Sequence, residues 1–299
     1  MQQKTLADVE ASLNHTLFPQ SLILDTINMC NYSCSICARR RMTRPKGKMP
    51  FALAKRLLDE ISVEAPMTKV WLVFYGEPLL AAERIALLST YARSRGIKNL
   101  HLNTNASLLD EDKAEIILNS GISQVVVSVD GFSDATYDSM RQPGFRSRVY
   151  YNLQRFLDMS HGRSDAPEII AQIVRCEKTE SEIDIFTDYW KARGATVKIK
   201  EHISWTAPSE KEWDSKNRIA CPWIFTTLPV LWTGKTALCG ADYDGAGSVG
   251  NIADGIKVLW NGAHRIVRDI HLQHRFEDLP AICKKCTDWN ILGSDIKKP

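Results

Sequence analysis

Hydrophobic and polar positions alternate in a regular order along the first two thirds of the chain. Short runs rich in β-branched and aromatic residues, typical of buried strands, take turns with longer stretches whose apolar residues recur at helical spacing. The expected strands are residues 22–28, 69–75, 99–105, 124–130, 168–174 and 196–203. The expected helices are residues 51–61, 81–94, 109–119, 146–157 and 183–192. Alternating strands and helices form βαβ units, so we expect a parallel sheet with right-handed crossovers.

Six such units predict an α/β fold in the form of a partial (βα)6 barrel, like a TIM barrel that stays open. The pattern changes after residue 203, because residues 204–218 are polar and predict a linker or a single helix. Further on, residues 228–232 and 235–239 predict a β-hairpin that turns at Gly234. We therefore divide the chain into a barrel core at 1–203, with a polar lead-in at 1–20, and a small C-terminal α+β domain at 204–299.

Composition is that of an ordinary globular protein, with 299 residues, 44% hydrophobic, 24% charged and a net charge of +3. This charge does not favour nucleic acid as a partner or attraction to a membrane surface. The first residues lack the apolar stretch of a secretory signal, and no segment approaches the ~20 apolar residues of a membrane span. We therefore expect a cytoplasmic protein, in which eight cysteines indicate metal ligands rather than disulfides.

Three of these cysteines, Cys30, Cys34 and Cys37, follow the first expected strand with the spacing C-x3-C-x2-C. A tight loop with three thiolates can bind three corners of a cubane iron–sulfur cluster. The fourth iron is then open to a substrate or cofactor, as open metal positions are in catalytic sites generally. A disulfide loop or a zinc knuckle is the alternative, although structural zinc takes four ligands and no fourth Cys or His follows nearby.

This loop resembles the signature of the radical S-adenosylmethionine (radical SAM) enzymes, although Ile36 stands where that family more often has an aromatic residue. The resemblance implies that the fourth iron chelates the amino and carboxylate groups of SAM. It implies further that one electron from the cluster splits SAM into methionine and a 5′-deoxyadenosyl radical, which removes hydrogen from the substrate. A one-electron donor such as flavodoxin or ferredoxin is then a required partner.

Polar residues at the ends of the following strands fit a SAM pocket. A glycine allows close backbone approach and a carboxylate can accept hydrogen bonds from an ammonium group, so the resemblance assigns residues 76–78 to the amino group of SAM. It assigns the end of the fourth strand to the ribose hydroxyls or the carboxylate. Ordinary turn chemistry is the alternative for most of these residues. The candidates are Gly76, Glu77, Pro78, Asn103, Asn105, Ser128, Asp130, Arg141 and Gln172.

A second set of cysteines lies in the C-terminal region, at Cys221, Cys239, Cys283 and Cys286. Its first half resembles the auxiliary-cluster modules called SPASM and twitch, and the total of four cysteines resembles the one-cluster form. Four thiolates occupy all four irons of a second [4Fe-4S] cluster, which indicates electron transfer or structural support rather than substrate ligation. A structural four-cysteine zinc site is the alternative.

The substrate is less defined. Six basic residues lie between 39 and 48, and they predict either a solvated loop or a clamp for an anionic, phosphorylated substrate. Candidate substrate contacts are Arg41, Arg44, Tyr75, Lys200 and His202. No catalytic acid or base is identified.

We expect hydrogen abstraction from a small polar molecule of the sugar, aminocyclitol or nucleotide type in a biosynthetic pathway. The auxiliary cluster would accept an electron or donate sulfur. Modification of a peptide or protein residue is the second hypothesis. A non-catalytic iron–sulfur or zinc protein is the hypothesis from another class.

Overall fold

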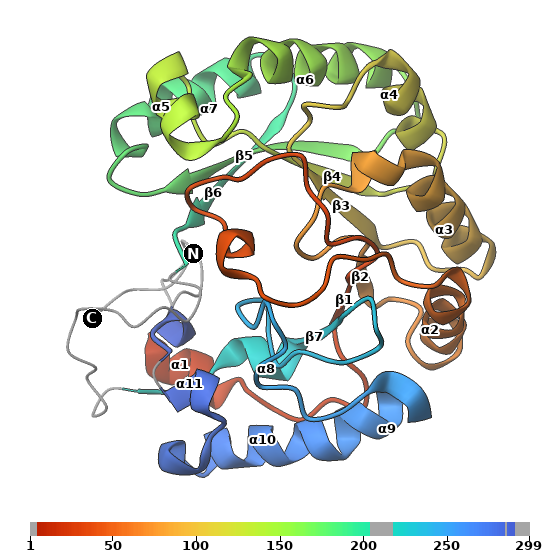
Figure 1. The fold of residues 1–299 in the computed structure, drawn as a ribbon, viewed down its shortest axis with the longest axis vertical. Helices are drawn as coiled ribbons and strands as arrows, with labels where there is room; N and C mark the ends of the chain where they lie inside the picture. The colour runs from red at the N-terminus through yellow and green to blue at the C-terminus, as the bar shows by residue number, and fades with distance from the viewer. Residues whose placement is uncertain (1–4, 204–217, 285, 291–299) are drawn as a thin grey trace.

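A computed structural model describes residues 5–203, 218–284 and 286–290, in which a curved sheet of seven parallel strands is the central element (Figure 1). The strands are β1 (Ser21–Leu24), β2 (Lys69–Trp71), β3 (Leu100–Thr104), β4 (Gln124–Ser128), β5 (Glu168–Arg175), β6 (Thr196–Glu201) and β7 (Thr227–Val230). Their order across the sheet is β6-β5-β4-β3-β2-β1-β7, so β6 and β7 are the two edges. The sheet does not close, which confirms the predicted open α/β barrel.

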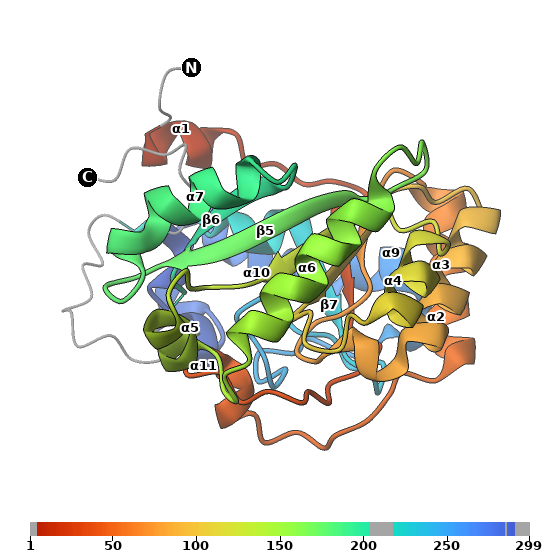
Figure 2. The same cartoon turned by 90° about the horizontal axis from the view of Figure 1, so that it is seen from above.

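Helices cover the outer side of this sheet (Figure 2). The barrel helices are α2 (Phe51–Glu64), α3 (Ala82–Ser94), α4 (Glu111–Leu118), α5 (Asp134–Met140), α6 (Arg146–Ser160) and α7 (Ile183–Lys191). The remaining helices are α1 (Leu6–Ala11), α8 (Pro222–Thr226), α9 (Ile256–Asn261), α10 (Ala263–Leu272) and α11 (Ala281–Lys284). Helices α8 to α10 lie on the side of β7 (Figure 1). None of the described helices is long and apolar enough to cross a membrane.

The seventh strand is a correction to the predicted count of six. β7 belongs to the C-terminal region and pairs in parallel with β1, from Ser21 opposite Thr227 to Leu24 opposite Val230. All four residues of β7 are buried, and the pairing covers an edge of β1 that would otherwise expose unpaired backbone groups. The predicted turn at Gly234 is present, but only an antiparallel bridge between Val230 and Thr236 forms the hairpin. The predicted linker at 204–218 lies almost wholly outside the described residues.

Two strands end four residues earlier than predicted, at Leu24 and at Trp71, whereas β3, β4 and β6 end only one or two residues early. Beyond these points the backbone groups find partners in loops, as where the Thr26 hydroxyl donates to the carbonyl of Leu72 at 2.6 Å. The chain thus leaves the sheet on the two segments that carry the cysteine loop and the Gly76-Glu77-Pro78 turn.

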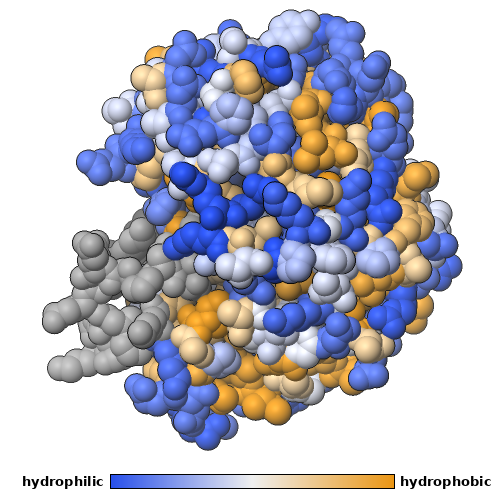
Figure 3. Space-filling view, in the orientation of Figure 1, coloured by the Kyte–Doolittle hydropathy of each residue, from blue (hydrophilic) through white to orange (hydrophobic). Residues whose placement is uncertain are grey.

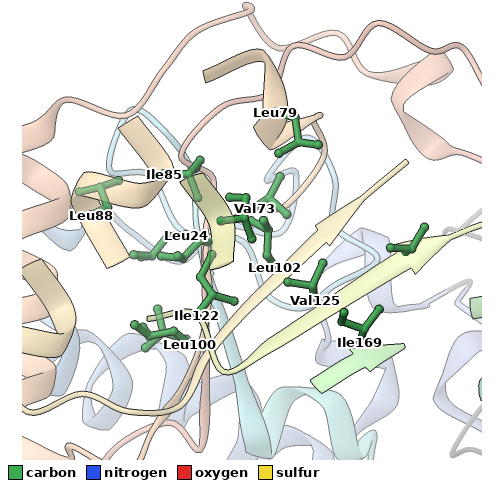
Figure 4. Close-up of a cluster of buried hydrophobic side chains, with 14 of the residues drawn as sticks. Leu24, Val73, Leu79, Ile85, Leu88, Leu100, Leu102, Ile122, Val125 and Ile169 are labelled. Atoms are coloured by element: carbon green, nitrogen blue, oxygen red, sulfur yellow. The ribbon is translucent and has the colours of Figure 1, made fainter. Parts of the chain in front are cut away.

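Period-two alternation divides each strand between an apolar outer face and a mixed inner face. Outward-facing residues such as Leu24, Leu102 and Val125 pack with Ile85 and Leu88 of α3 in the main hydrophobic core (Figure 4). The inner face carries both polar and apolar side chains, and it is this face that borders the cavity described below.

Candidate active site

A cavity of about 360 Å³ lies on the inner side of the sheet, and its lining includes residues at the carboxyl ends of the strands. All three cysteines of the first loop line it. So do eight of the nine residues predicted for the SAM pocket, namely Gly76, Glu77, Asn103, Asn105, Ser128, Asp130, Arg141 and Gln172. Pro78 lies outside the lining and begins the short 3-10 helix η2 (Pro78–Ala81). The structure therefore brings the two predicted sets of residues together around one space.

The cysteine loop is held against the end of α5 and the segment that follows it. The backbone N–H of Ser33 donates to the carbonyl of Gln142 at 2.6 Å, and that of Ser35 donates to the carbonyl of Met140 at 3.1 Å. The loop ends in the 3-10 helix η1 (Ala38–Arg41). On the face seen in Figure 3, strongly hydrophilic residues gather across the middle, where Figure 1 draws this red-orange part of the chain.

Each of the three sulfur atoms has a hydrogen-bond donor directed at it. Backbone N–H groups donate to Cys30 Sγ at 3.4 Å and to Cys37 Sγ at 3.5 Å. Side chains add Asn105 Nδ2 at 3.9 Å from Cys30 Sγ and Arg141 Nη1 at 3.7 Å from Cys34 Sγ. Burial raises the pKa of the Cys30 thiol to about 11, so a bound cation is needed to keep it as a thiolate. The donor set therefore fits an iron–sulfur cluster.

Glu77 is completely enclosed and joins the ends of two strands. Its Oε1 accepts hydrogen bonds from Leu79 N at 3.0 Å and from the Thr104 hydroxyl at 2.7 Å, while Oε2 accepts from Asn105 N at 2.8 Å. Burial raises the pKa of Glu77, and these donors oppose that effect. Beside it, a Cβ on Gly76 would lie only 2.2 Å from the carbonyl oxygen of Ile27, so only glycine fits. This turn therefore sets the distance between β2 and the cysteine loop.

The end of β4 carries a buried ion pair. Asp130, with a positive φ of 60°, is fully buried and pairs through Oδ2 with Arg141 Nη2. Its Oδ1 accepts a hydrogen bond from Val174 N at 2.8 Å. Since Arg141 also donates to Cys34, a continuous polar chain runs from β5 through Asp130 to the cysteine loop. Among the described residues, the buried Oδ1 of Asn103 in the same cavity has no hydrogen-bond partner, which leaves an acceptor for a bound ligand.

Only two of the five predicted substrate contacts line the cavity. Tyr75 and Lys200 line the cavity, and Tyr75 donates through its hydroxyl to the carbonyl of Gly240 at 2.7 Å. Arg41, Arg44 and His202 are not among its lining residues.

The guanidinium of Arg44 binds groups of the protein itself. Its Nη1 lies 2.5 Å from Oδ2 of the fully buried Asp25, and its Nε donates to the carbonyl of Tyr243 at 2.7 Å. These contacts do not support the predicted phosphate clamp at Arg44. Two other members of the basic run 39–48, Arg39 and Arg40, do line the cavity, and so does Lys198, which the sequence analysis did not assign. Lys198 could have been identified from the sequence, because it lies two residues before Lys200 on the same strand and therefore on the same face.

The second cysteine set also converges. Cys221, Cys239, Cys283 and Cys286 line a separate cavity of about 30 Å³. Backbone N–H groups donate to Cys239 Sγ at 3.4 Å and to Cys286 Sγ at 3.3 Å. Burial raises the pKa of Cys221 to about 12 and that of Cys286 to about 11, so here too thiolates need a bound cation. Four such ligands around one small space fit a fully ligated iron–sulfur cluster.

An open parallel barrel with a three-cysteine loop at its cavity and a four-cysteine site beside it is the architecture of an iron–sulfur enzyme. Comparison with known families gives the same class. The family model of the radical SAM superfamily matches residues 24–162, and that of the iron-sulfur cluster-binding SPASM domain matches residues 221–287. The chain is a radical SAM enzyme with a C-terminal SPASM domain, as its cysteine spacings predicted. A [4Fe-4S] cluster, SAM and an auxiliary iron–sulfur cluster are therefore its cofactors.

The curated proteins that match this chain share only about a quarter of its residues. A GTP 3′,8-cyclase of Xanthomonas axonopodis pv. citri is 25% identical over 252 residues, which cover 78% of this chain and 72% of the relative. A GTP 3′,8-cyclase of Mannheimia succiniciproducens is 22% identical over 181 residues, and the match spans only about half of it, 52%.

Among solved structures, BtrN in complex with AdoMet and 2-DOIA has a TM-score of 0.62 at 18% identity, covering 92% of this chain and 94% of BtrN. Native anSMEcpe with bound AdoMet and Cp18Cys peptide has a TM-score of 0.65 at 15% identity, covering 91% of this chain and 87% of anSMEcpe. These likenesses show that the fold is shared.

Proposed function

We propose that this enzyme cleaves SAM reductively and uses the resulting 5′-deoxyadenosyl radical to remove hydrogen from a small polar substrate in a biosynthetic pathway. The observation that carries the proposal is the convergence of Cys30, Cys34 and Cys37 with eight predicted SAM-pocket residues around one cavity. The bound cluster and SAM would supply the radical chemistry, and the chain supplies binding and orientation.

Residue roles follow from the contacts. Cys30, Cys34 and Cys37 would hold the cluster that binds SAM, with Asn105 and Arg141 as donors to two of the sulfurs. Hydrogen bonds to cluster sulfurs are one of the means by which proteins set reduction potentials. Asn103, Ser128 and Gln172 line the cavity with polar groups suited to the ribose and carboxylate of SAM. Glu77 accepts three hydrogen bonds from the protein itself, so it would hold the turn in place rather than receive a group of SAM.

The four cysteines of the second site would hold the auxiliary cluster. Trp223 and Gly240 line the main cavity, whereas their near neighbours Cys221 and Cys239 line the smaller one. The same two short stretches of chain, 221–223 and 239–240, thus border both spaces. This proximity supports a role for the auxiliary cluster in the reaction itself, either as acceptor of an electron from the substrate radical or as a donor of sulfur.

A small substrate is favoured by the size of the space, because the cavity of about 360 Å³ would hold the cluster and SAM as well, which leaves only part of it for the substrate. The cyclases named above act on GTP by name, which supports a nucleotide-like molecule. Modification of a peptide residue is the second candidate, because anSMEcpe shares the fold and binds a Cp18Cys peptide.

The test is anaerobic reconstitution followed by incubation with SAM and dithionite, with 5′-deoxyadenosine measured by mass spectrometry. Wild type should bind about eight irons, the sum of two four-iron clusters, and form 5′-deoxyadenosine. The triple variant Cys30→Ala, Cys34→Ala, Cys37→Ala should keep about half of the iron and form none. Cleavage of SAM by that variant at the wild-type rate would refute the assignment. Flavodoxin or ferredoxin should replace dithionite as the electron donor.

A further inference from the structure

Helix α10 carries a polar face that is turned into the protein. His264, Arg268 and His271 recur along it at helical spacing, and none of the three is more than 1% exposed. His264 stacks on the ring of Trp260, and Arg268 donates to the carbonyl of Trp260 at 2.6 Å. These two side chains therefore pack α10 against α9. His271 instead lines the small cavity of the second cysteine set.

The imidazole of His271 has a defined tautomer. The backbone N–H of Cys221 donates to His271 Nδ1 at 3.4 Å, so Nδ1 carries no proton and the proton of the neutral ring is on Nε2. This buried Nε2 has no hydrogen-bond partner among the described residues. A protonated ring nitrogen has no lone pair for iron, so the atom can donate to sulfur but cannot be a fifth ligand.

A second N–H group without a partner borders the same cavity. Trp289 lines it and is 8% exposed, and its buried indole Nε1 has no hydrogen-bond partner in the described part of the chain. The ring packs with Val9 and Ile219, which holds the indole in place. Because an indole nitrogen only donates, and because unpaired buried donors are costly, two such groups at one small cavity indicate an acceptor inside it.

The auxiliary cluster is an acceptor of the right kind. A cubane with four thiolates is an anion whose sulfur atoms accept hydrogen bonds, and its negative charge grows by one on reduction. Backbone N–H groups already donate to Cys239 Sγ and Cys286 Sγ, so His271 and Trp289 would add two side-chain donors. A donor stabilises the more negative, reduced cluster most, so each such bond raises the reduction potential.

We propose that His271 and Trp289 donate hydrogen bonds to sulfur atoms of the auxiliary cluster and thereby raise its reduction potential. This inference rests on the proposed function, in which the second cysteine set holds that cluster. It also deepens that function, because a higher potential favours transfer of one electron from the substrate radical to the cluster. The two side chains are positioning residues, since neither ligates iron nor touches the substrate.

The reduction potential of the auxiliary cluster tests the proposal. The parent protein is the full chain with the three cysteines of the first loop replaced by alanine, in which only the auxiliary cluster contributes to the EPR signal. His271→Asn offers an oxygen near the position of Nδ1 for the Cys221 N–H, but does not reach the position of Nε2. His271→Gln places an amide N–H near that position. Trp289→Phe keeps an aromatic ring and removes the N–H.

In a redox titration followed by EPR, His271→Asn and Trp289→Phe should each lower the ratio of reduced to oxidised cluster by about tenfold at a given potential, a shift of about 59 mV for one electron. His271→Gln should keep most of the parent's potential. The matched controls are His274→Asn and Trp232→Phe, because neither residue lines this cavity. Both controls should titrate as the parent does.

A second measurement needs no substitution near the cluster. With histidine labelled by the heavy nitrogen isotope, pulsed EPR of the reduced parent should detect coupling to a histidine nitrogen. Equal shifts in His271→Asn and His271→Gln, or no such coupling, overturn the role of His271. The parent's potential in Trp289→Phe overturns that of Trp289. In these cases a bound four-iron cluster still supports the proposed function, whereas a parent that binds no iron overturns the cluster assignment as well.

Discussion

Replacing Glu77 by glutamine separates two possible roles of this carboxylate. In the structure it accepts three hydrogen bonds from Leu79, Thr104 and Asn105, which makes it a brace between β2 and β3. The family resemblance instead suggested that it receives the ammonium group of SAM. Glutamine has the same shape, so the substitution changes charge and donor pattern with little change in packing.

The expected cost follows from the three bonds. With the amide nitrogen in place of Oε2, the Asn105 N–H faces another donor and loses its acceptor. Hydrogen bonds to charged groups contribute about 1.5–3 kcal/mol and neutral ones about 0.5–1.5, so one bond is lost and two are weakened. The reduced cost of burying a neutral group offsets part of this, and we expect a loss of about 3 kcal/mol in the free energy of unfolding.

Urea unfolding of the reconstituted protein without SAM, followed by circular dichroism, measures this loss directly. The control is Glu83→Gln, in the exposed first turn of α3, which should unfold as wild type does. SAM affinity, measured by calorimetry, should fall as well, because Asn105 also contacts Cys30 and Asn31. An unchanged urea midpoint combined with weaker SAM binding would refute the brace and restore the ammonium role.

Three further predictions concern buried charge, pH and metal. Arg44→Gln leaves the fully buried Asp25 without its cation and should cost about 3–5 kcal/mol in urea unfolding, whereas a substrate clamp at Arg44 would alter KM alone. Burial lowers the pKa of His264 from 6.5 to about 4. Between these two pH values the unfolded chain binds a proton on this imidazole and the folded chain does not. Stability should therefore fall between pH 7.5 and 5.5 by about 1.3 kcal/mol more in wild type than in His264→Phe, by urea titration at both pH values. Cys239→Ser should halve the iron content measured by colorimetry and lower the melting temperature; full iron retention would contradict its role as a ligand.

The barrel was predictable because its signals are local. Period-two runs and helical spacing identify six strands and their helices, and parallel βαβ units leave little choice of topology. The first cysteine loop and Gly76 were predictable for the same reason, since each comes just after one of the expected strands, 22–28 and 69–75. The strand ends at Leu24 and Trp71 were not, because loop contacts formed only in the folded chain take over the hydrogen bonds there.

Contacts between distant segments were beyond the reach of the sequence. The charge run around Arg44 shows that the segment is basic, but not that this guanidinium turns inward to Asp25. A strand was expected at residues 228–232, where β7 lies, but as one arm of a hairpin, and its parallel pairing with β1 was not predictable. Its partner β1 lies about two hundred residues earlier in the chain. Pro229 is tolerated in β7 because this is an edge strand.

The position of β7 connects the two cysteine sites physically. Cys221 directly precedes α8, which leads into β7, and Cys239 follows shortly after the turn at Gly234. Two expected ligands of the auxiliary cluster therefore flank the strand that completes the barrel edge beside β1. β1 in turn leads into the loop of Cys30, Cys34 and Cys37. A metal bound at the second site would hold β7 against β1, so its loss should be felt in the geometry of the first site as well as in the C-terminal domain. Sensitivity of SAM binding to the auxiliary cysteines is thus expected even if the auxiliary cluster exchanges no electron with the substrate.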